Sequence, residues 1–390
     1  MAARQLSMLS AFTGLGGMDL GLEAAGFRSL GCLEIDHDAQ LTLKANRGDQ
    51  WPLLGNGDVS VAAADLQSND LGLAVGELDL LAGAPPCQPF SKAAQWTPTA
   101  RLGDADGRAA CLDDFFGLAR SLCPHVLLLE NVPGYVRGPT SQLPRLCHLT
   151  EELSRSVGLS YSLEWRIVNA ADYGVPQSRQ RAVVLISRSG ELTWPDAAAE
   201  RRTAWDALHD APTSQATPKL RGKWGDLLPT IPPGENYQWH TSRGGGRPLF
   251  GYRTRYSSFL RKLCPELPSP TITGTVGPAN GPFHWENRPL TIWERQRLQS
   301  LPGDWIVEGS WYSQIKQVGN ATPPLLAEVL GRALGQLLGA TVSSRMHLEL
   351  SKADSECIPP PTQSDLPAKF LHLIGSHADH PGAGKGPRPR

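Results

Sequence analysis

The sequence predicts a doubly wound α/β domain followed by a smaller, loop-rich domain. Three observations support this fold class. Several short apolar runs lack alternating polar residues, as strands buried on both faces of a parallel sheet do. Amphipathic helical patterns separate these runs in the first half of the chain. Between about residues 195 and 285 the periodicity fades, and Pro, Gly, Trp, Arg and Tyr dominate.

The expected elements follow in chain order. The strands of the sheet are predicted at Leu6–Phe12, Leu30–Ile35, Leu78–Ala82, Val126–Leu129 and Ala182–Ile186. The helices are predicted at Met18–Ala25, Thr291–Ser300 and Pro324–Leu338. The chain then divides into a first domain over 1–195, a second over 196–285, and a segment over 286–345 that returns to the first. Residues 346–390 are rich in Pro, Ser, His and Gly, and we expect a mostly disordered tail.

Composition excludes several classes of protein. The chain has 390 residues, of which 40% are hydrophobic and 19% charged, so disorder of the whole chain is not expected. No apolar run approaches about 18 residues, and the N-terminus lacks a signal peptide, so we expect a cytoplasmic protein with no membrane span. Seven cysteines without a Cys-x-x-Cys pair argue against a metal site and a disulfide framework.

The charge is unevenly distributed along the chain. The net charge is −1, yet the window from Lys219 to Lys262 holds nine basic residues and two acidic ones. A basic island on an acidic body suits a polyanion that touches one face, although a solvated loop region has the same composition.

A glycine-rich loop, Phe12-Thr-Gly14-Leu-Gly16-Gly17, follows the first strand and opens a helix. Such glycines let the backbone approach a ligand, or serve only tight strand–helix packing. The dinucleotide fingerprint is not met, because Asp19 stands where its third glycine belongs. Glu34, at the end of the second strand, suits ribose hydroxyls or a helix start. Together they favour an adenosyl group without a pyrophosphate.

Three later segments carry candidate catalytic groups. Cys87 lies in Gly83-Ala-Pro-Pro-Cys-Gln-Pro-Phe-Ser91, a proline-clamped loop after a buried strand, which favours a nucleophile over a core cysteine. Glu130 ends another buried run, where ionisation is costly, as for a general acid, although a helix cap is the alternative. Arg179 and Arg181 enter a strand and are expected on one face, where they bind an anion or form salt bridges. Gln317-Val-Gly-Asn-Ala-Thr-Pro-Pro324 is interpreted as a tight turn before a helix.

These segments, in this order and spacing, resemble the DNA (cytosine-5) methyltransferase family of the restriction–modification type. The resemblance covers about residues 6–340, and its Pro-Pro-Cys-Gln-Pro-Phe-Ser, Glu-Asn-Val and Gln-x-Arg-x-Arg motifs are together highly specific. It implies a Rossmann-like, S-adenosylmethionine-dependent catalytic domain over 1–195 and a target recognition domain over 196–285. The stretch Arg288–Pro302 is similar to the family's brace of the second domain.

The resemblance also implies the cofactor and its residues. The loop from Phe12 holds S-adenosylmethionine, Glu34 binds the ribose, Ile35 lies beside the adenine, and Asp58 contacts the adenine amino group. The cofactor-binding residues carried over are Phe12, Thr13, Gly14, Leu15, Gly16, Gly17, Glu34, Ile35, Asp58, Val59, Pro86, Asn320 and Ala321. Leu112 is the candidate for a further leucine contact.

The implied chemistry uses Cys87, Glu130, Arg179 and Arg181. The Cys87 thiolate attacks carbon 6 of cytosine and makes carbon 5 nucleophilic. Glu130 donates to nitrogen 3, and Arg179 stabilises oxygen 2. No base for the carbon-5 proton is evident, so we expect water to accept it. A stacked base is out of reach, and the cytosine therefore flips out of the duplex.

The expected partner is double-stranded DNA, bound by a monomer. A cognate restriction endonuclease is a partner in function without a stable complex. The DNA-binding residues carried over are Gln88, Ser91, Lys92, Arg253, Arg255, Thr271 and Thr273. The loop from Gln88 to about Ala110 is expected to close over the DNA as a lid.

Three alternative functions stay open at this stage. An RNA cytosine-5 methyltransferase of the same fold is the nearest, and activity on tRNA against duplex DNA separates the two. A DNA-binding regulator with a lapsed active site is disfavoured because every catalytic position is filled. A nicotinamide oxidoreductase is disfavoured by the glycine spacing.

Overall fold

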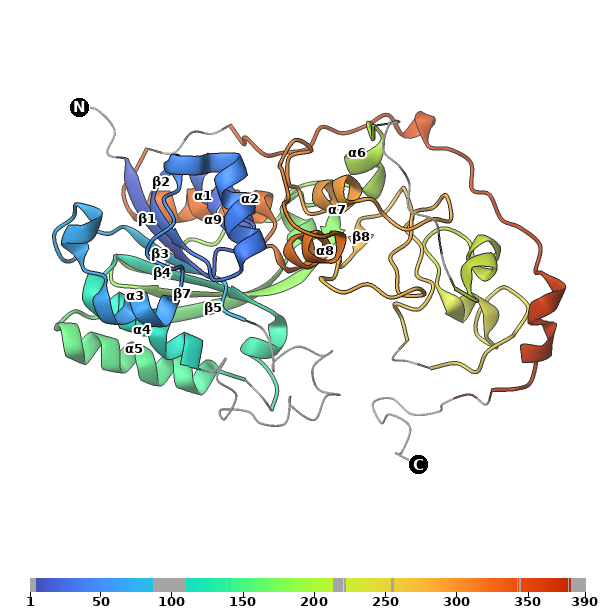
Figure 1. Cartoon of the computed structure of the whole chain (residues 1–390), viewed down its shortest axis with the longest axis horizontal. Helices are drawn as coiled ribbons and strands as arrows, with labels where there is room; N and C mark the ends of the chain where they lie inside the picture. Colours follow the sequence, from blue (N-terminus) through green and yellow to red (C-terminus); the bar gives the residue numbers. More distant parts are fainter. Residues whose placement is uncertain are drawn as a thin grey trace.

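The structure of the chain is a computed structural model. It describes residues 5–86, 110–139, 141–212, 220, 222–253, 256–341, 343, 345–377 and 379. An α/β part and a loop-rich part lie side by side, and the chain crosses between them more than once (Figure 1).

Six strands form the central sheet in the order β2-β1-β3-β4-β7-β5. Their bounds are β1 Leu6–Ala11, β2 Phe27–Leu33, β3 Leu80–Gly83, β4 Val126–Asn131, β5 Ser162–Asn169 and β7 Gln180–Ser187. The first four run parallel, as predicted. Their carboxyl ends therefore meet at one edge of the sheet, which is where ligands bind in such folds.

Strand β7 corrects the prediction of an all-parallel sheet, because it runs antiparallel to both β4 and β5. The sequence analysis also missed β5, whose polar and apolar residues are mixed. Residues 170–179 join β5 to β7 through the short 3₁₀ helix η8, Ala170–Tyr173. A parallel pair needs a crossover of a dozen or more residues, so this short connection requires the reversed direction.

Helices cover both faces of the sheet. In Figure 1, α1, α2 and α9 lie on one side and α3, α4 and α5 on the other. Their bounds are α1 Gly17–Ala24, α2 His37–Arg47, α3 Val59–Asp65, α4 Ala110–Leu122, α5 Leu143–Val157 and α9 Pro324–Leu337. Leu22 of α1 and Leu326 of α9 are both fully buried in one core, although they come from opposite ends of the chain. Phe115 and Phe116 of α4 fill the core on the other face.

The second part has little regular structure. Its elements and the helices that adjoin them are η9 Gly225–Thr230, η10 Tyr237–His240, β8 Ser269–Pro270, α6 Ala204–Leu208, α7 Ile292–Leu298 and α8 Trp311–Asn320. Strand β8 pairs with β6, Gln177–Ser178, and so joins the two parts. An aromatic cluster that includes Trp224, Tyr237 and Phe250 forms the core around η9 and η10. Aromatic rings therefore pack together with buried leucines to form this core, although the segments that carry them are mostly irregular.

Residues 345–377 are ordered against the rest of the molecule, which corrects the prediction of a disordered tail. Fully buried Glu328 of α9 accepts hydrogen bonds from the backbone of His347 and Leu348. Farther along, Phe370 of η12, Ala368–Leu373, stacks on Trp224 with ring centroids 6.2 Å apart. We call residues 345–377 the C-terminal strap, because they run from α9 to the far end of the loop-rich part (Figure 1). Residues 380–390 lie outside the described part.

In the described part of the chain, none of the helices has the length and the apolar character needed to cross a membrane.

Candidate active site

The loop between β1 and α1 adopts backbone conformations that its glycines permit. Gly14 and Gly16 have positive φ angles of 59° and 88°, and Gly16 is the N-cap of α1. A Cβ on Gly16 would lie 2.7 Å from the Trp51 ring, so both the angle and the close approach require glycine. Phe12 also has a positive φ of 55°, an uncommon strain for a bulky residue and one typical of functional loops.

Glu34 ties this loop to the end of β2. Its two carboxyl oxygens accept hydrogen bonds from the backbone N–H of Gly14, at 2.6 Å, and of Asp36, at 2.7 Å. Burial raises the pKa of Glu34, while the two N–H donors act in the opposite direction. Each carboxyl oxygen keeps a further acceptor site for ligand hydroxyls.

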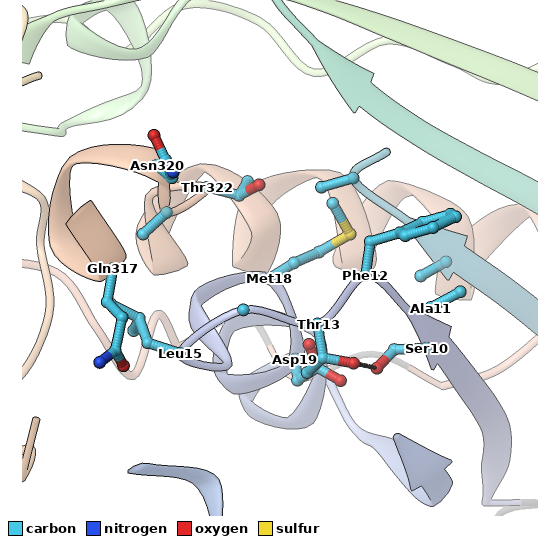
Figure 2. A pocket seen from close by; sticks show the side chains of 14 residues that line it. Ser10, Ala11, Phe12, Thr13, Leu15, Met18, Asp19, Gln317, Asn320 and Thr322 are labelled. Atoms are coloured by element: carbon cyan, nitrogen blue, oxygen red, sulfur yellow. Dashed lines mark hydrogen bonds between the residues drawn. The ribbon is translucent and has the colours of Figure 1, made fainter. Parts of the chain in front are cut away.

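A cavity of about 400 Å³ opens beside this tie, which is the size of a small-molecule site. Eight of the predicted cofactor residues line it: Phe12, Gly14, Glu34, Ile35, Asp58, Val59, Pro86 and Asn320. A smaller cavity of about 60 Å³ adjoins it and adds Thr13, Leu15 and Ala321. The predicted cofactor residues Gly16 and Gly17 line neither of these two cavities; Gly16 is the N-cap of α1 and Gly17 its first residue. In Figure 2, Asn320 and Thr322 lie across from the loop that carries Phe12 and Thr13.

The cavity fits an adenosyl ligand by the chemistry of its wall. Ile35 is 69% exposed, which is unusual for an isoleucine and offers an apolar surface to a planar ring. Asp58 is the N-cap of α3 and accepts from Ser60 through Oδ1. Among the described residues, no cluster of possible metal ligands is present.

Sequence reasoning missed several residues of this wall. Lys316 of α8 forms an ion pair with Asp36 at 2.7 Å, and both line the cavity. Asp114 of α4 also lines it, and burial, with Asp113 and Asp58 nearby, raises the pKa of Asp114. The proposed leucine contact is wrong, because Leu112 is 4% exposed and packs in the core while Cys111 faces the cavity. Helical periodicity in α4, had it been applied, would have separated these two positions.

Asp19 of α1 lies fully buried in the wall of the smaller cavity, near the thiol of Cys32, which donates to its Oδ1 at 3.8 Å. Burial raises the pKa of Asp19 to about 6, from an ordinary value of about 4. The folded state therefore holds a proton that the unfolded state releases, and ionisation costs stability as the pH rises through this range.

We expect Asp19→Asn to gain stability relative to the wild type as the pH rises. The advantage should be absent near pH 4 and should grow by about 3 kcal/mol towards pH 7, where the cost of the buried charge is complete. Urea unfolding at pH 4, 5, 6 and 7 measures it, with exposed Asp49→Asn as the control. A difference that stays constant with pH would contradict the prediction.

Glu130 is the last residue but one of β4 and is buried beside Arg181 of β7. Arg181 Nε lies 2.6 Å from Glu130 Oε1, and Thr322 donates to Oε2 at 3.2 Å. The two strands are direct neighbours, which places the acid and the arginine side by side. The next residue, Asn131, donates to the carbonyl of Pro85 at 3.0 Å and so holds the start of the proline loop against β4.

Arg179 has a different environment from the one predicted. It is 1% exposed, and its guanidinium donates to the carbonyls of Ile272, Gly319 and Ala321 at 2.8–3.1 Å. It lies at the break between β6 and β7, so the alternation that would put it on the face of Arg181 does not apply. We therefore correct its assignment as a substrate-binding group: Arg179 ties the second part to the segment after α8.

The remaining predicted residues have mixed outcomes. Cys87, Gln88, Ser91, Lys92, most of the expected lid, and Arg255 lie outside the described residues. Thr271 donates to the carbonyl of Ser178 at 2.8 Å, where the two parts meet, and Thr273 nearby is exposed. The backbone of Arg253 is anchored on both sides by the hydroxyl of Tyr237.

Gln317–Asn320, interpreted as a turn, is the last part of α8, and residues 321–323 lead directly into α9.

A model of the C-5 cytosine-specific DNA methylase family matches residues 6–336 of the chain. The chain belongs to this family. Members of this methylase family are S-adenosylmethionine-dependent methyltransferases. Membership confirms the family and the enzyme class predicted from the sequence, and it excludes a nicotinamide oxidoreductase.

Curated relatives of this methylase include type II methyltransferases from distant bacteria. The type II methyltransferase M.SacI of Streptomyces achromogenes is 32% identical over 377 residues, which cover 86% of this chain and 94% of that protein. M.NgoMIV of Neisseria gonorrhoeae is 31% identical over 344 residues, which cover 85% and 97%.

Solved structures share the fold of the methylase at low identity. A prophage-encoded protein of Escherichia coli, described as a DNA modification methyltransferase, superposes with a TM-score of 0.59 at 23% identity, covering 86% of this chain and 99% of that one. The Dnmt2 methyltransferase of S. pombe gives 0.55 at 15% identity, covering 86% and 99%. These likenesses confirm the α/β fold class.

Proposed function

We propose that this methylase transfers a methyl group from S-adenosylmethionine to carbon 5 of a cytosine in a specific duplex sequence, as the modification enzyme of a type II system. One observation carries the proposal. Thr322 lines the smaller cavity beside the cofactor site and donates to Glu130, so the acid lies directly behind the wall that the cofactor would share. Cofactor residues and catalytic acid thus converge at the carboxyl ends of β1, β2 and β4.

The residues divide the work as follows. The loop from Phe12, with Glu34, Ile35 and Asp58, would hold S-adenosylmethionine, which when bound supplies an electrophilic methyl group for carbon 5. Cys87 forms a bond to carbon 6 of the target base, and the displaced electron pair is drawn towards nitrogen 3 and oxygen 2. Glu130 protonates nitrogen 3 and takes this proton back when carbon 5 loses its own proton, to water, and the bond to Cys87 breaks.

Arg181, rather than Arg179, is the group that we assign to oxygen 2. It is half-buried next to Glu130, while Arg179 is occupied by three backbone carbonyls. A guanidinium fixed beside the acid would stabilise negative charge on the oxygen at the same moment that Glu130 serves nitrogen 3. The target base has to leave the duplex to reach this pair.

A transfer assay tests the proposed function directly. Purified chain is incubated with isotopically labelled S-adenosylmethionine and either duplex DNA of random sequence or mixed tRNA. We expect label on DNA only, and methylation-aware sequencing should find 5-methylcytosine confined to one sequence motif. Label on tRNA alone would favour the RNA methyltransferase, and label on neither would favour a non-enzymatic regulator.

The basic window of the loop-rich part would bind the duplex. We expect Arg253→Ala to weaken DNA binding because arginine grips phosphate or guanine, the latter discriminating by about 1–3 kcal/mol. If Arg253 contacts a phosphate, all sequences weaken alike and the salt slope falls by about one. If it reads a base, one position of the methylated motif relaxes.

Equilibrium binding at several salt concentrations and methylation profiles distinguish these outcomes. Arg28→Ala, an exposed arginine on the edge strand β2, is the matched control. A variant that equals the wild type in affinity, salt slope and profile would show that this stretch does not face DNA.

A further inference from the structure

Thr322 stands between the two halves of the candidate active site. It belongs to the short segment between α8 and α9, is 5% exposed, and lines the smaller cavity together with Phe12 and Asn320. Its hydroxyl donates to Oε2 of Glu130 at 3.2 Å across a sequence separation of 192 residues. The sequence motif Gln317–Pro324 contains this threonine, but its pattern assigns it no role.

The contact gives the Glu130 carboxyl a second anchor. Oε1 faces Arg181 Nε at 2.6 Å, and Oε2 faces the Thr322 hydroxyl. The anchors come from different sides, since Arg181 lies on the neighbouring strand β7 while Thr322 comes from the segment before α9. With both oxygens engaged, rotation of the carboxyl about its last bond is restricted.

The two anchors are not chemically equivalent. A guanidinium only donates hydrogen bonds, whereas a hydroxyl donates or accepts by turning about its C–O bond. Oε1 is therefore held by the fixed positive charge of Arg181, and Oε2 is the oxygen better suited to carry a proton. By donating to one lone pair of Oε2, the Thr322 hydroxyl leaves the other lone-pair site of that oxygen for the proton that passes to the base, so it stays a partner through a proton transfer.

The position of Thr322 is itself fixed. A Cβ added to Gly17 would lie 2.4 Å from the Thr322 carbonyl oxygen, which shows that this segment is pressed against the first turn of α1. Three residues on, Leu325 N donates to Ser300 Oγ at 3.1 Å. The hydroxyl is thus presented to Glu130 by a backbone that the cofactor loop supports.

We propose that Thr322 is a positioning residue for Glu130, holding Oε2 in the orientation from which the acid delivers its proton to the target base. The inference rests on the proposed function, because it assigns Thr322 to the same reaction. Thr322 acts through Glu130 and does not itself touch the reacting atoms.

The test compares three variants with the wild type. Thr322→Val keeps the shape and removes the hydroxyl, Thr322→Ser keeps the hydroxyl, and Thr150→Val removes an equally buried hydroxyl in α5 that bonds only its own helix. We expect Thr322→Val to lower kcat about tenfold with unchanged KM for DNA and unchanged cofactor affinity. Thr322→Ser should restore kcat to within about threefold, and Thr150→Val should resemble the wild type.

Adding Thr322→Val to Glu130→Gln separates positioning from a general structural role. If Thr322 acts through the acid, the second change should lower kcat no further than Glu130→Gln alone. The inference is overturned if Thr322→Val is fully active, if serine does not rescue it, if cofactor binding falls as much as kcat, or if the two changes are additive. A wild type that does not methylate DNA, or a fully active Glu130→Gln, would instead overturn the proposed function on which it rests.

Discussion

Cys87→Ser should lose methyl transfer entirely and still bind duplex DNA. A free thiol with a pKa of about 8.5 is about 3% ionised at pH 7, and the site must raise this fraction, whereas a serine hydroxyl is essentially never ionised there. Without an anion at this position no bond to carbon 6 forms, and carbon 5 stays unreactive. Binding should persist because phosphate contacts supply most of the affinity.

Two measurements check this expectation. Transfer of labelled methyl groups to DNA reports turnover, and DNA carrying 5-fluorocytosine should trap the wild type as a covalent adduct, because fluorine cannot leave as a cation. Cys147→Ser, an exposed cysteine in α5, is the control and should behave as the wild type in both. Substantial turnover by Cys87→Ser would exclude the covalent mechanism.

Glu130→Gln should reduce turnover by about 100-fold or more, the usual contribution of a positioned general acid. The amide still donates a hydrogen bond towards nitrogen 3 but delivers no proton. It also places an amide beside Arg181 and Thr322, where the carboxyl now forms an ion pair with the first and accepts a hydrogen bond from the second. Cofactor affinity should stay near normal, because Glu130 lies behind the cavity wall and does not line it.

Single-turnover methylation and calorimetric titration with S-adenosylmethionine measure the two properties separately. Glu151→Gln, exposed on α5, controls for the loss of a negative charge. An equal loss of cofactor binding in Glu130→Gln would assign the residue a structural role in place of a catalytic one.

The cofactor side of the site was predictable because each part of it is local in sequence. The loop Phe12–Gly17 follows β1 and Glu34 follows β2, and in a parallel sheet the ends of neighbouring strands meet without further information. Asp58 and Val59 were placed by resemblance, and the cavity includes them. The residues of this wall that the sequence did not predict lie on α4 and α8. Which face of each helix lines the cavity depends on how the helix packs against the rest of the molecule.

The catalytic side was harder to predict because it depends on contacts between distant segments. Alternation along a strand predicted Arg179 and Arg181 on one face. The rule fails because the strand is interrupted between β6 and β7, and the sequence pattern does not indicate this interruption. The partnership of Glu130 with Arg181 requires β7 to lie beside β4, which in turn depends on the direction of β7. The contact of Glu130 with Thr322 joins residues 192 positions apart in the sequence.

The prediction of a disordered tail was wrong for residues 345–377. Composition indicates how much apolar surface a segment can bury by itself, and not which partners the rest of the molecule offers it. The C-terminal strap has few apolar residues, yet Phe370 docks on an aromatic cluster formed by the loop-rich part. Backbone groups at His347 and Leu348 gain a buried carboxylate partner from α9.

The pairing of α1 with α9 has a consequence for how the protein folds during its synthesis. About 300 residues separate the two helices, so at a synthesis rate of 5–20 residues per second α1 waits about 15–60 s for its partner to leave the ribosome. Throughout that interval the face of the sheet that carries α1 and α2 lacks α9, and neither Asn320 nor Thr322 has joined the site. A nascent or prematurely terminated chain therefore exposes apolar surface that favours aggregation, and its active site is incomplete. The enzyme cannot begin to modify DNA before almost its whole length has been translated.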